Sequence, residues 1–366
     1  MSPTSFKPGI LTQEETGLNA DFVKTFDVGN LPSPLNFAFG AEWREETYKI
    51  AAGDVASYSA GPAFIFGVGS DGFQGFPLES EGSFASASYA GYIDIEADLT
   101  DSFTLGGAVR YEDYDEFGDT TNFKLSGRLE ISEQFALRAT ASTGFRAPTP
   151  GQVNTLNTTT TADPSGNLIP SGTYPVGSTV AMVLGSVPLT PEESTSYTLG
   201  AVWSAADNVS ITLDYYDISI EDRLALFNTT ITAQDVLDLT AAGVPNAGLL
   251  LGGLAGYFTN AFDSDVTGFD LAIIVNFDVG SGDLLVDLRY NQNEQDISNV
   301  ASGTINAARV IDLEQQVPDN RVALTFNYDT GNALSGYLRL NSYGGWDSTG
   351  GLFNGSNPPD VYSYGS

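Results

Sequence analysis

The sequence predicts an all-β fold, a transmembrane antiparallel β-barrel with about twelve strands in this chain. Three observations lead to this prediction. Runs of about ten residues alternate apolar and polar side chains, the connections between runs alternate between short and long, and charged side chains fall on one side of each run. A tilted strand of roughly 9–11 residues is long enough to cross a bilayer.

The run at residues 135–144 illustrates the alternation. Phe135 and Leu137 point to one side of the predicted strand, and Arg138 and Thr140 point to the other. The same pattern predicts strands at 18–28, 36–44, 91–99, 103–112, 122–131, 135–144, 197–203, 209–216, 269–276, 284–291, 321–328 and 334–341.

The connections fall into two classes that alternate along the chain. The short ones lie at 30–35, 100–102, 132–134, 204–207, 280–282 and 330–332. The longer ones lie at about 49–88, 113–120, 145–193, 221–263 and 294–319. Short periplasmic turns and long extracellular loops are the plan of an outer-membrane barrel.

Charges in the predicted strands gather on the face that would line a wet lumen, and the opposite face is almost free of charge, as lipid requires. The lumen-side charges are Arg44, Arg110, Lys124, Arg128, Arg138, Arg289, Arg321, Arg339, Glu42, Asp94, Glu96, Asp98, Glu112, Glu130, Asp214, Asp270 and Asp287. A soluble β-sandwich also alternates, but its strands are shorter and a long open sheet exposes edges that aggregate. Aromatic residues near strand ends fit girdles at the membrane interfaces, namely Trp43, Tyr48, Tyr111, Tyr114, Tyr197, Trp203, Tyr290, Tyr328 and Tyr343.

Composition excludes several classes of function. The 366 residues contain 14 Lys and Arg against 46 Asp and Glu, a net charge of −32, so no nucleic-acid partner is expected. Cysteine and histidine are absent, which excludes disulfides, Cys/His zinc sites and a Ser-His-Asp triad. The chain is not expected to be an enzyme or to hold a cofactor. No 18 consecutive residues are apolar, so a helical membrane protein is also excluded.

Six segments, in this order, resemble TonB-dependent outer-membrane receptors. They are GAEWREETY (40–48), VRYEDYDEFGDTTNFKLSGRLE (109–130), LRATASTGFRAPTPGQ (137–152), LTPEESTSYTLGAVW (189–203), ITLDYYDISIEDRL (211–224) and VTGFDL (266–271). The resemblance implies a barrel of about 22 strands with a plugged lumen, in the outer membrane of a Gram-negative bacterium. It also implies that extracellular loops capture a scarce small-molecule or oligosaccharide ligand, and that the TonB complex acts through the plug.

The sequence departs from that family pattern at both ends. No plug domain or TonB-contacting segment is recognised ahead of the first strand, and the last strand ends on the long-loop side. We therefore expect residues 1–366 to form one partial receptor barrel, without the plug and the last strands, whose partners are outer-membrane lipid and, through the plug of the parent receptor, the TonB complex. The alternative function is a passive porin or a structural barrel.

Arg146 is a candidate ligand or lumen residue because it lies at a strand mouth. Pro148 and Pro150 cannot donate to a sheet ladder, so pairing ends just after Arg146 and the 145–193 loop begins. A guanidinium there can pair with loop carboxylates and brace the loop base, or contact an anionic ligand. The other candidates are Arg110, Arg128 and Arg138 on the lumen wall and Asn154, Asn157 and Tyr174 in the loop.

Three other patterns in the sequence bear on chemistry or loop structure. The segment DYDEFGD (113–119) groups four carboxylates, which allows a calcium site but is more typical of a solvated hairpin loop. Asp94 and Glu96 share a face, yet nothing marks them as a catalytic pair. In 232–246, Thr232 as N-cap and the apolar spacing that follows predict a short helix in the long loop, either a ligand wall or a packing element.

The loop composition bears on the ligand. The interval 145–191 has no histidine, so imidazole ligation of haem is impossible there, although Tyr174 could substitute. Hydroxyl and amide side chains dominate the loop instead, and an acidic mouth repels unshielded anions. We therefore expect an oligosaccharide or a ferric siderophore rather than haem.

Overall fold

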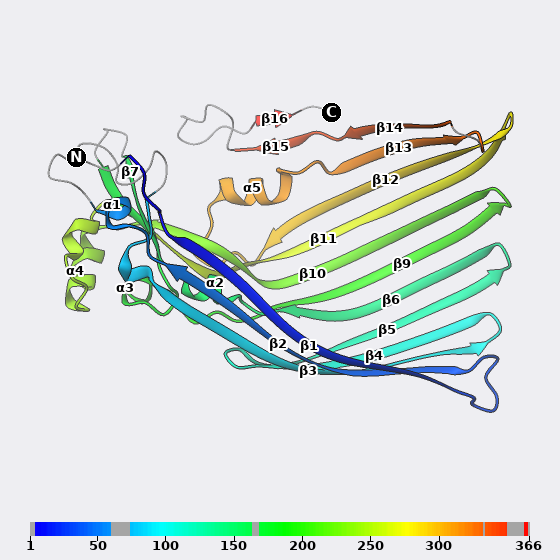
Figure 1. Ribbon diagram of the computed structural model, residues 1–366, viewed down its shortest axis with the longest axis horizontal. Helices are drawn as coiled ribbons and strands as arrows, with labels where there is room; N and C mark the ends of the chain where they lie inside the picture. The colour runs from blue at the N-terminus through cyan, green and yellow to red at the C-terminus, as the bar shows by residue number, and fades with distance from the viewer. Residues whose placement is uncertain (1–3, 60–73, 163–167, 332–333, 350–361, 365–366) are drawn as a thin grey trace.

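A computed structural model describes residues 4–59, 74–162, 168–331, 334–349 and 362–364. For 159–162, 168–170 and 362–364 it describes the backbone alone. Twelve strands follow one another in a single curved antiparallel path, as Figure 1 shows. They are β1 (Ile10–Phe26), β2 (Leu35–Ala51), β3 (Gly82–Thr100), β4 (Phe103–Tyr114), β5 (Gly118–Ser132), β6 (Phe135–Arg146), β9 (Glu192–Ala206), β10 (Val209–Thr230), β11 (Leu254–Val279), β12 (Gly282–Ser298), β13 (Asn320–Asp329) and β14 (Ser335–Tyr343). The twelve predicted strands are confirmed, in a sheet that is not closed.

Most strands are longer than the predicted ten residues and reach 26 residues in β11. The extra residues lie at the ends that face the long loops, as in the Glu221–Thr230 half of β10 paired with β11. Alternation marks a strand only where its two faces meet different surroundings. Beyond the membrane both faces meet water or other loops, so the sequence pattern does not mark the extensions.

Helices and long loops gather at one end of the sheet and tight turns at the other (Figure 1). The loop end carries α1 (Val55–Tyr58), η1 (Leu78–Ser80), α2 (Pro150–Asn154), α3 (Thr179–Val183), α4 (Ala233–Ala241), η2 (Ala247–Leu250) and α5 (Ala307–Gln315). The helix predicted in 232–246 is confirmed as α4, whose Thr232 and Asp235 form a capping box. The link predicted at 113–120 is instead a tight hairpin, because β4 and β5 pair as far as Tyr114 and Gly118.

Two further strands form inside the loop between β6 and β9. β7 (Asn157–Ala162) and β8 (Leu168–Thr173) pair as a hairpin, and β8 also adds in parallel to the start of β11. The loops are joined by a cluster of Ile231, Leu239, Ala247 and Ala255, against which Tyr174 and α3 residues pack. We call this cluster the loop core. The loop between β6 and β9 and the loop between β10 and β11 are therefore one packed unit.

The strand register gives the sheet a charged face and an apolar face. Asp94, Ala108, Lys124 and Ser142 lie directly opposite one another on the charged face. The next row, on the apolar face, carries Gly107, Leu125, Ala141 and Tyr197. Leu125 is 58% exposed, and most other large side chains of this face are similarly uncovered. Such a surface needs an apolar solvent. None of the described helices is long and apolar enough to span a membrane.

Of the aromatic residues predicted to form girdles, Trp43, Tyr111 and Tyr197 lie on the apolar face, as such girdles require. The girdle prediction is wrong for Tyr48, Tyr114 and Tyr343. Tyr48 contacts Thr155, Tyr114 contacts Arg44, and Arg321 lies over the Tyr343 ring. These three tyrosines occupy the alternate strand positions, so their rings lie on the charged face.

Candidate ligand site at the lumen mouth

Arg146 and Glu192 close the root of the loop between β6 and β9. Arg146 ends β6, Glu192 begins β9, and the two are register partners. The guanidinium donates from Nε to Oε2 at 2.7 Å and from Nη2 to Oε1 at 2.8 Å. The Glu192 side chain is only 9% exposed and also accepts from the backbone N–H of Leu224 in β10 at 2.7 Å. Arg146 thus braces the loop base by tying three strands together.

Arg138 makes a similar pair lower on the charged face. It donates from Nε to Oδ1 of Asp214 at 2.9 Å and from Nη2 to Oδ2 at 2.6 Å. Gly200 lies between them in register, and a Cβ on Gly200 would stand 2.1 Å from Asp214 Oδ1. Tyr92 reaches Asp21 across Gly40 in the same way, at 2.7 Å. Long side chains therefore lie flat on the wall where a glycine leaves room.

Glu112 is the centre of a hydrogen-bonded network on β2, β3 and β4. It is only 4% exposed, yet it accepts from Arg110 Nε at 3.0 Å, Tyr114 Oη at 2.7 Å and Ser88 Oγ at 3.3 Å. Arg110 also donates to Glu42 at 2.9 Å, and Arg44 donates to the Tyr114 hydroxyl at 2.9 Å. A buried carboxylate needs this degree of compensation. The network fixes Arg44, Arg110 and Tyr114 at the loop end of the charged face.

A cavity of about 340 Å³, with both polar and apolar walls, lies between this network and the Arg146 brace. Its lining residues are Arg44, Glu46, Ser86, Ser88, Tyr114, Phe145, Arg146, Ala147, Pro148, Thr149 and Pro150. One wall is the start of α2, which Thr149 and Gln152 order through a capping box. The cavity offers guanidinium and hydroxyl donors to a ligand.

A second polar cleft, of about 720 Å³, lies between β12, α5 and β15 (Trp346–Ser348). Its lining residues are Gln292, Asn293, Glu294, Gln295, Asp296, Glu314, Gln315, Val317, Asp319, Asn320, Gly345, Trp346 and Asp347. Glu314 accepts from the backbone N–H of Ile297, and Asp312 accepts from the backbone N–H and hydroxyl of Thr349, so α5 is held to both walls. Amides and carboxylates with no lining cation suit hydroxyl-bearing or cationic groups.

The remaining predicted residues lie apart from these two cavities. Arg128 pairs with Glu130 on its own strand. Asn154 donates to the carbonyl of Pro150 at 3.0 Å and so closes α2. Asn157 begins β7. Tyr174 packs on the loop core, where burial raises the pKa of its phenol. Their contact with a ligand stays a prediction.

The calcium interpretation of 113–119 finds no support, because that part of the chain forms a hairpin and no cluster of three or more potential ligands occurs among the described residues. Sequence reasoning missed Glu192 as the partner of Arg146 and missed the pairing of Arg44 with Tyr114. The Arg146–Glu192 pair could have been inferred because the two residues lie at the two ends of one loop. The Arg44–Tyr114 pair could have been inferred because strand alternation places Tyr114 on the same face as Arg44.

A curved antiparallel sheet with one apolar face, one charged face, tight turns at one end and a packed loop unit at the other defines the wall of a transmembrane β-barrel. The chain belongs to the TonB-dependent receptors, because the family model described as TonB dependent receptor-like, beta-barrel matches residues 4–365. This family consists of receptors and transporters. The resemblance seen in the sequence is confirmed.

Solved structures agree on the fold. The chain is similar to the siderophore receptor PirA from Acinetobacter baumannii, with 16% identity, a TM-score of 0.61, and 97% of this chain and 47% of that chain covered. It is also similar to a mutant of the ferric enterobactin receptor PfeA from Pseudomonas aeruginosa, with 14% identity, a TM-score of 0.63, and 97% of this chain and 45% of that chain covered. For the RagAB peptide importer the identity is 11% and the TM-score is 0.57, with 91% of this chain and 41% of that chain covered. A comparison with curated protein sequences finds no match. The chain thus spans about half the length of these structural relatives, or less.

Proposed function

We propose that this chain forms the ligand-receiving part of an outer-membrane, TonB-dependent transporter of a Gram-negative bacterium. The observation that carries the proposal is the cavity between Arg44, Tyr114 and Arg146, at the loop end of the charged face and at the root of the packed loops. A ligand captured by the loops meets fixed donors there before it enters the lumen. The energy for release comes from the TonB complex acting through a plug, as in the family.

The ligand we favour is a ferric siderophore or an oligosaccharide. The cavity at the lumen mouth offers hydroxyl and guanidinium donors, and the cleft beside α5 offers amide and carboxylate acceptors. Together they suit a hydroxyl-rich ligand. Haem is disfavoured because the chain has no histidine and because Tyr174, the substitute ligand, packs on the loop core. By name, PirA is a siderophore receptor and PfeA is a ferric enterobactin receptor, which is consistent with the first choice.

The test is uptake by cells that produce the intact protein. Radiolabelled ferric siderophores and oligosaccharides are supplied with and without a functional TonB complex. We expect accumulation of one of these ligands only when TonB works, and loss of most of it in Arg44→Gln. Arg289→Gln is the matched control, because Arg289 pairs with Asp287 on its own strand and lines neither cavity. Accumulation that is independent of TonB would support the alternative, a passive porin. Uptake of haem alone would contradict the ligand class.

A further inference from the structure

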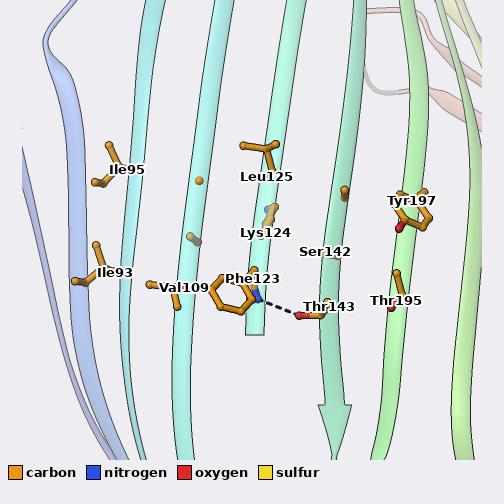
Figure 2. A pocket seen from close by; sticks show the side chains of 13 residues that line it. Ile93, Ile95, Val109, Phe123, Lys124, Leu125, Ser142, Thr143, Thr195 and Tyr197 are labelled. Atoms are coloured by element: carbon orange, nitrogen blue, oxygen red, sulfur yellow. Dashed lines mark hydrogen bonds between the residues drawn. The ribbon is translucent and has the colours of Figure 1, made fainter. Parts of the chain in front are cut away.

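The hollows of the sheet differ sharply in chemistry. The hollow drawn in Figure 2 is lined by side chains such as Ile93, Val109 and Phe123 and belongs to the lipid-facing surface of the wall. The cleft between β12, α5 and β15, which we call the α5 cleft, is polar. It is lined by the amides Gln292, Asn293, Gln295, Gln315 and Asn320, the carboxylates Glu294, Asp296, Glu314, Asp319 and Asp347, and the aromatic residue Trp346. Its volume of about 720 Å³ lies within the range of about 300–1,000 Å³ that small-molecule sites occupy.

The α5 cleft meets β12 at the margin of the sheet. The consecutive residues 292–296 all line it, although neighbours on a strand point to opposite faces. Both faces reach the cleft because β12 continues to Ser298, whereas β13 begins at Asn320, opposite Gln292. Beyond Gln292 this margin of β12 pairs with no strand in the described part of the chain. One space therefore receives polar side chains from both faces of the strand.

The walls of the cleft are fixed by hydrogen bonds. The backbone N–H of Asn293 donates to the carbonyl of Asp319 at 2.8 Å, and that of Ile297 donates to Glu314 at 2.9 Å. These bonds hold the start of β13 and the end of α5 to β12. On the other side, Asp312 holds the end of β15 to α5, and Figure 1 shows α5 between β12 and β15. A ligand therefore meets a preformed space, which lowers the cost of ordering on binding.

The negative charge of the cleft is not balanced by the side chains around it. No lysine or arginine is among the described residues that line it, and residues 291–320 contain only Arg309. Arg309 lies in the first turn of α5, whereas Glu314 and Gln315 in the last turn line the cleft. That last turn has no basic residue, and the carbonyls at a helix C-terminus carry partial negative charge. The cleft is therefore a place of negative potential that suits a cation.

The other long loops strengthen that potential. Residues 147–191 contain no lysine or arginine, and residues 221–263 contain only Arg223, in a chain with a net charge of −32. Like charges around a cleft focus the field in it and raise the local concentration of oppositely charged ligands. A cationic ligand is thus drawn to the loop end of the chain, and an anionic ligand is repelled.

The amides and Trp346 add a second requirement. An amide both donates and accepts hydrogen bonds, as a hydroxyl does, so a row of amides matches a ligand with many hydroxyls. Gln292 already accepts from the Tyr290 hydroxyl at 3.0 Å, which leaves its NH₂ group to donate. Trp346 offers an apolar wall to the C–H face of a sugar ring and attracts cations through its π system. A bare polyamine leaves the amides unused, and a neutral sugar leaves the potential unused.

We propose that the α5 cleft binds an oligosaccharide that carries free amino groups. Its ammonium groups lie beside Glu294, Asp296 and Asp347, its hydroxyls exchange hydrogen bonds with the amides of β12, and one ring lies against Trp346. This inference rests on the proposed function and narrows its ligand class from a siderophore or an oligosaccharide to an amino sugar.

The experiment is isothermal titration calorimetry of the intact receptor in detergent, at low salt and mildly acidic pH, where sugar amines and carboxylates are both charged. The probes are a glucosamine tetrasaccharide, its N-acetylated counterpart, spermine and a galacturonate tetrasaccharide. They offer charge with hydroxyls, hydroxyls alone, charge alone and the opposite charge. We expect the glucosamine tetrasaccharide to bind at least about tenfold more tightly than the other three. Its affinity should fall as salt is raised.

Glu294→Gln combined with Asp296→Asn should weaken this binding by about tenfold or more. Both side chains are exposed, so their replacement leaves the fold intact. Asp113→Asn combined with Asp119→Asn is the matched control, because it removes the same charge from two exposed, facing residues outside the cleft. The control should bind like the wild type. Equal losses in the two double variants would overturn the assignment to the cleft.

Trp346→Phe should abolish the change in tryptophan fluorescence that the glucosamine tetrasaccharide causes in the wild-type receptor, and an unaltered change would place the ligand elsewhere. Equal affinity for the N-acetylated sugar or for spermine would overturn the ligand class, and so would preference for galacturonate. Binding in detergent needs no TonB complex. These outcomes therefore leave the proposed transport function standing, whereas uptake that is independent of TonB removes that function without touching the cleft.

Discussion

Arg138 and Asp214 form a bidentate ion pair although their strands, β6 and β10, do not pair with each other. The side chains meet across β9, where Gly200 has no side chain to separate them. The glycine and the ion pair are thus one feature of the lumen wall.

Gly200→Ala should therefore lower the free energy of unfolding by about 1–3 kcal/mol, because the added carbon overlaps the carboxylate and forces both partners to move. Gly91→Ala on the apolar face should be neutral or slightly stabilising, since its Cβ would find only the carbonyl of Gly40 at 3.7 Å. Urea unfolding in lipid vesicles, followed by tryptophan fluorescence, measures both. Equal losses would mean that the crowding at Gly200 is relieved elsewhere.

Arg146→Leu should loosen the loop between β6 and β9, because it leaves the nearly buried Glu192 with only a backbone donor. A lost charged hydrogen bond of this kind costs about 1.5–3 kcal/mol, less here because Arg146 itself is half exposed. The rate of limited proteolysis within 147–191 should rise. Arg128→Leu is the control, because its partner Glu130 is exposed and water can solvate the carboxylate when the arginine is removed. An unchanged proteolysis rate in Arg146→Leu would remove the bracing role.

Arginine placed at Leu125, Leu213 or Leu324 should impair membrane insertion by about 2–4 kcal/mol near the midplane. Arginine at Ser126, Thr212 or Thr325 should be mild, because these neighbours lie on the charged face. The fraction of intact protein that folds into vesicles reports the difference. Similar damage from the two sets would show that the faces are assigned wrongly.

High pH should open the loop core. Burial raises the pKa of Tyr174, so the folded loops hold the neutral phenol and lose stability as pH rises from its ordinary value near 10 through the raised pKa. Tyr174→Phe should make protection of the loops from proteolysis nearly independent of pH over that range. Ultraviolet titration of tyrosinate should show Tyr174 ionising after the exposed tyrosines. Loss of protection at the same pH in wild type and variant would assign the effect to another group.

The sequence predicts the strands, their faces and α4 because each leaves a local signal, namely a two-residue alternation or a capping residue. The long extensions of β10 and β11 and the β7–β8 hairpin leave no such signal. α5 does leave one, because Asn306 caps it, but the sequence analysis missed it. The partners of the arginines are equally hidden, because Arg138 and Asp214 are 76 residues apart and meet only through the register of β9. Arg146 could be placed at a strand mouth from two prolines, but not matched to Glu192.

The loop between β6 and β9 packs against the loop between β10 and β11, and this packing constrains the order in which the chain folds. Tyr174 donates its backbone N–H to Gly256, and the hairpin of β9 and β10 separates these residues along the chain. The two ends of this large closure approach each other only once β9, β10 and β11 are aligned. We therefore expect the packed loop unit to be among the last parts to form, so that its resistance to protease reports that the strands beneath it have already paired in correct register.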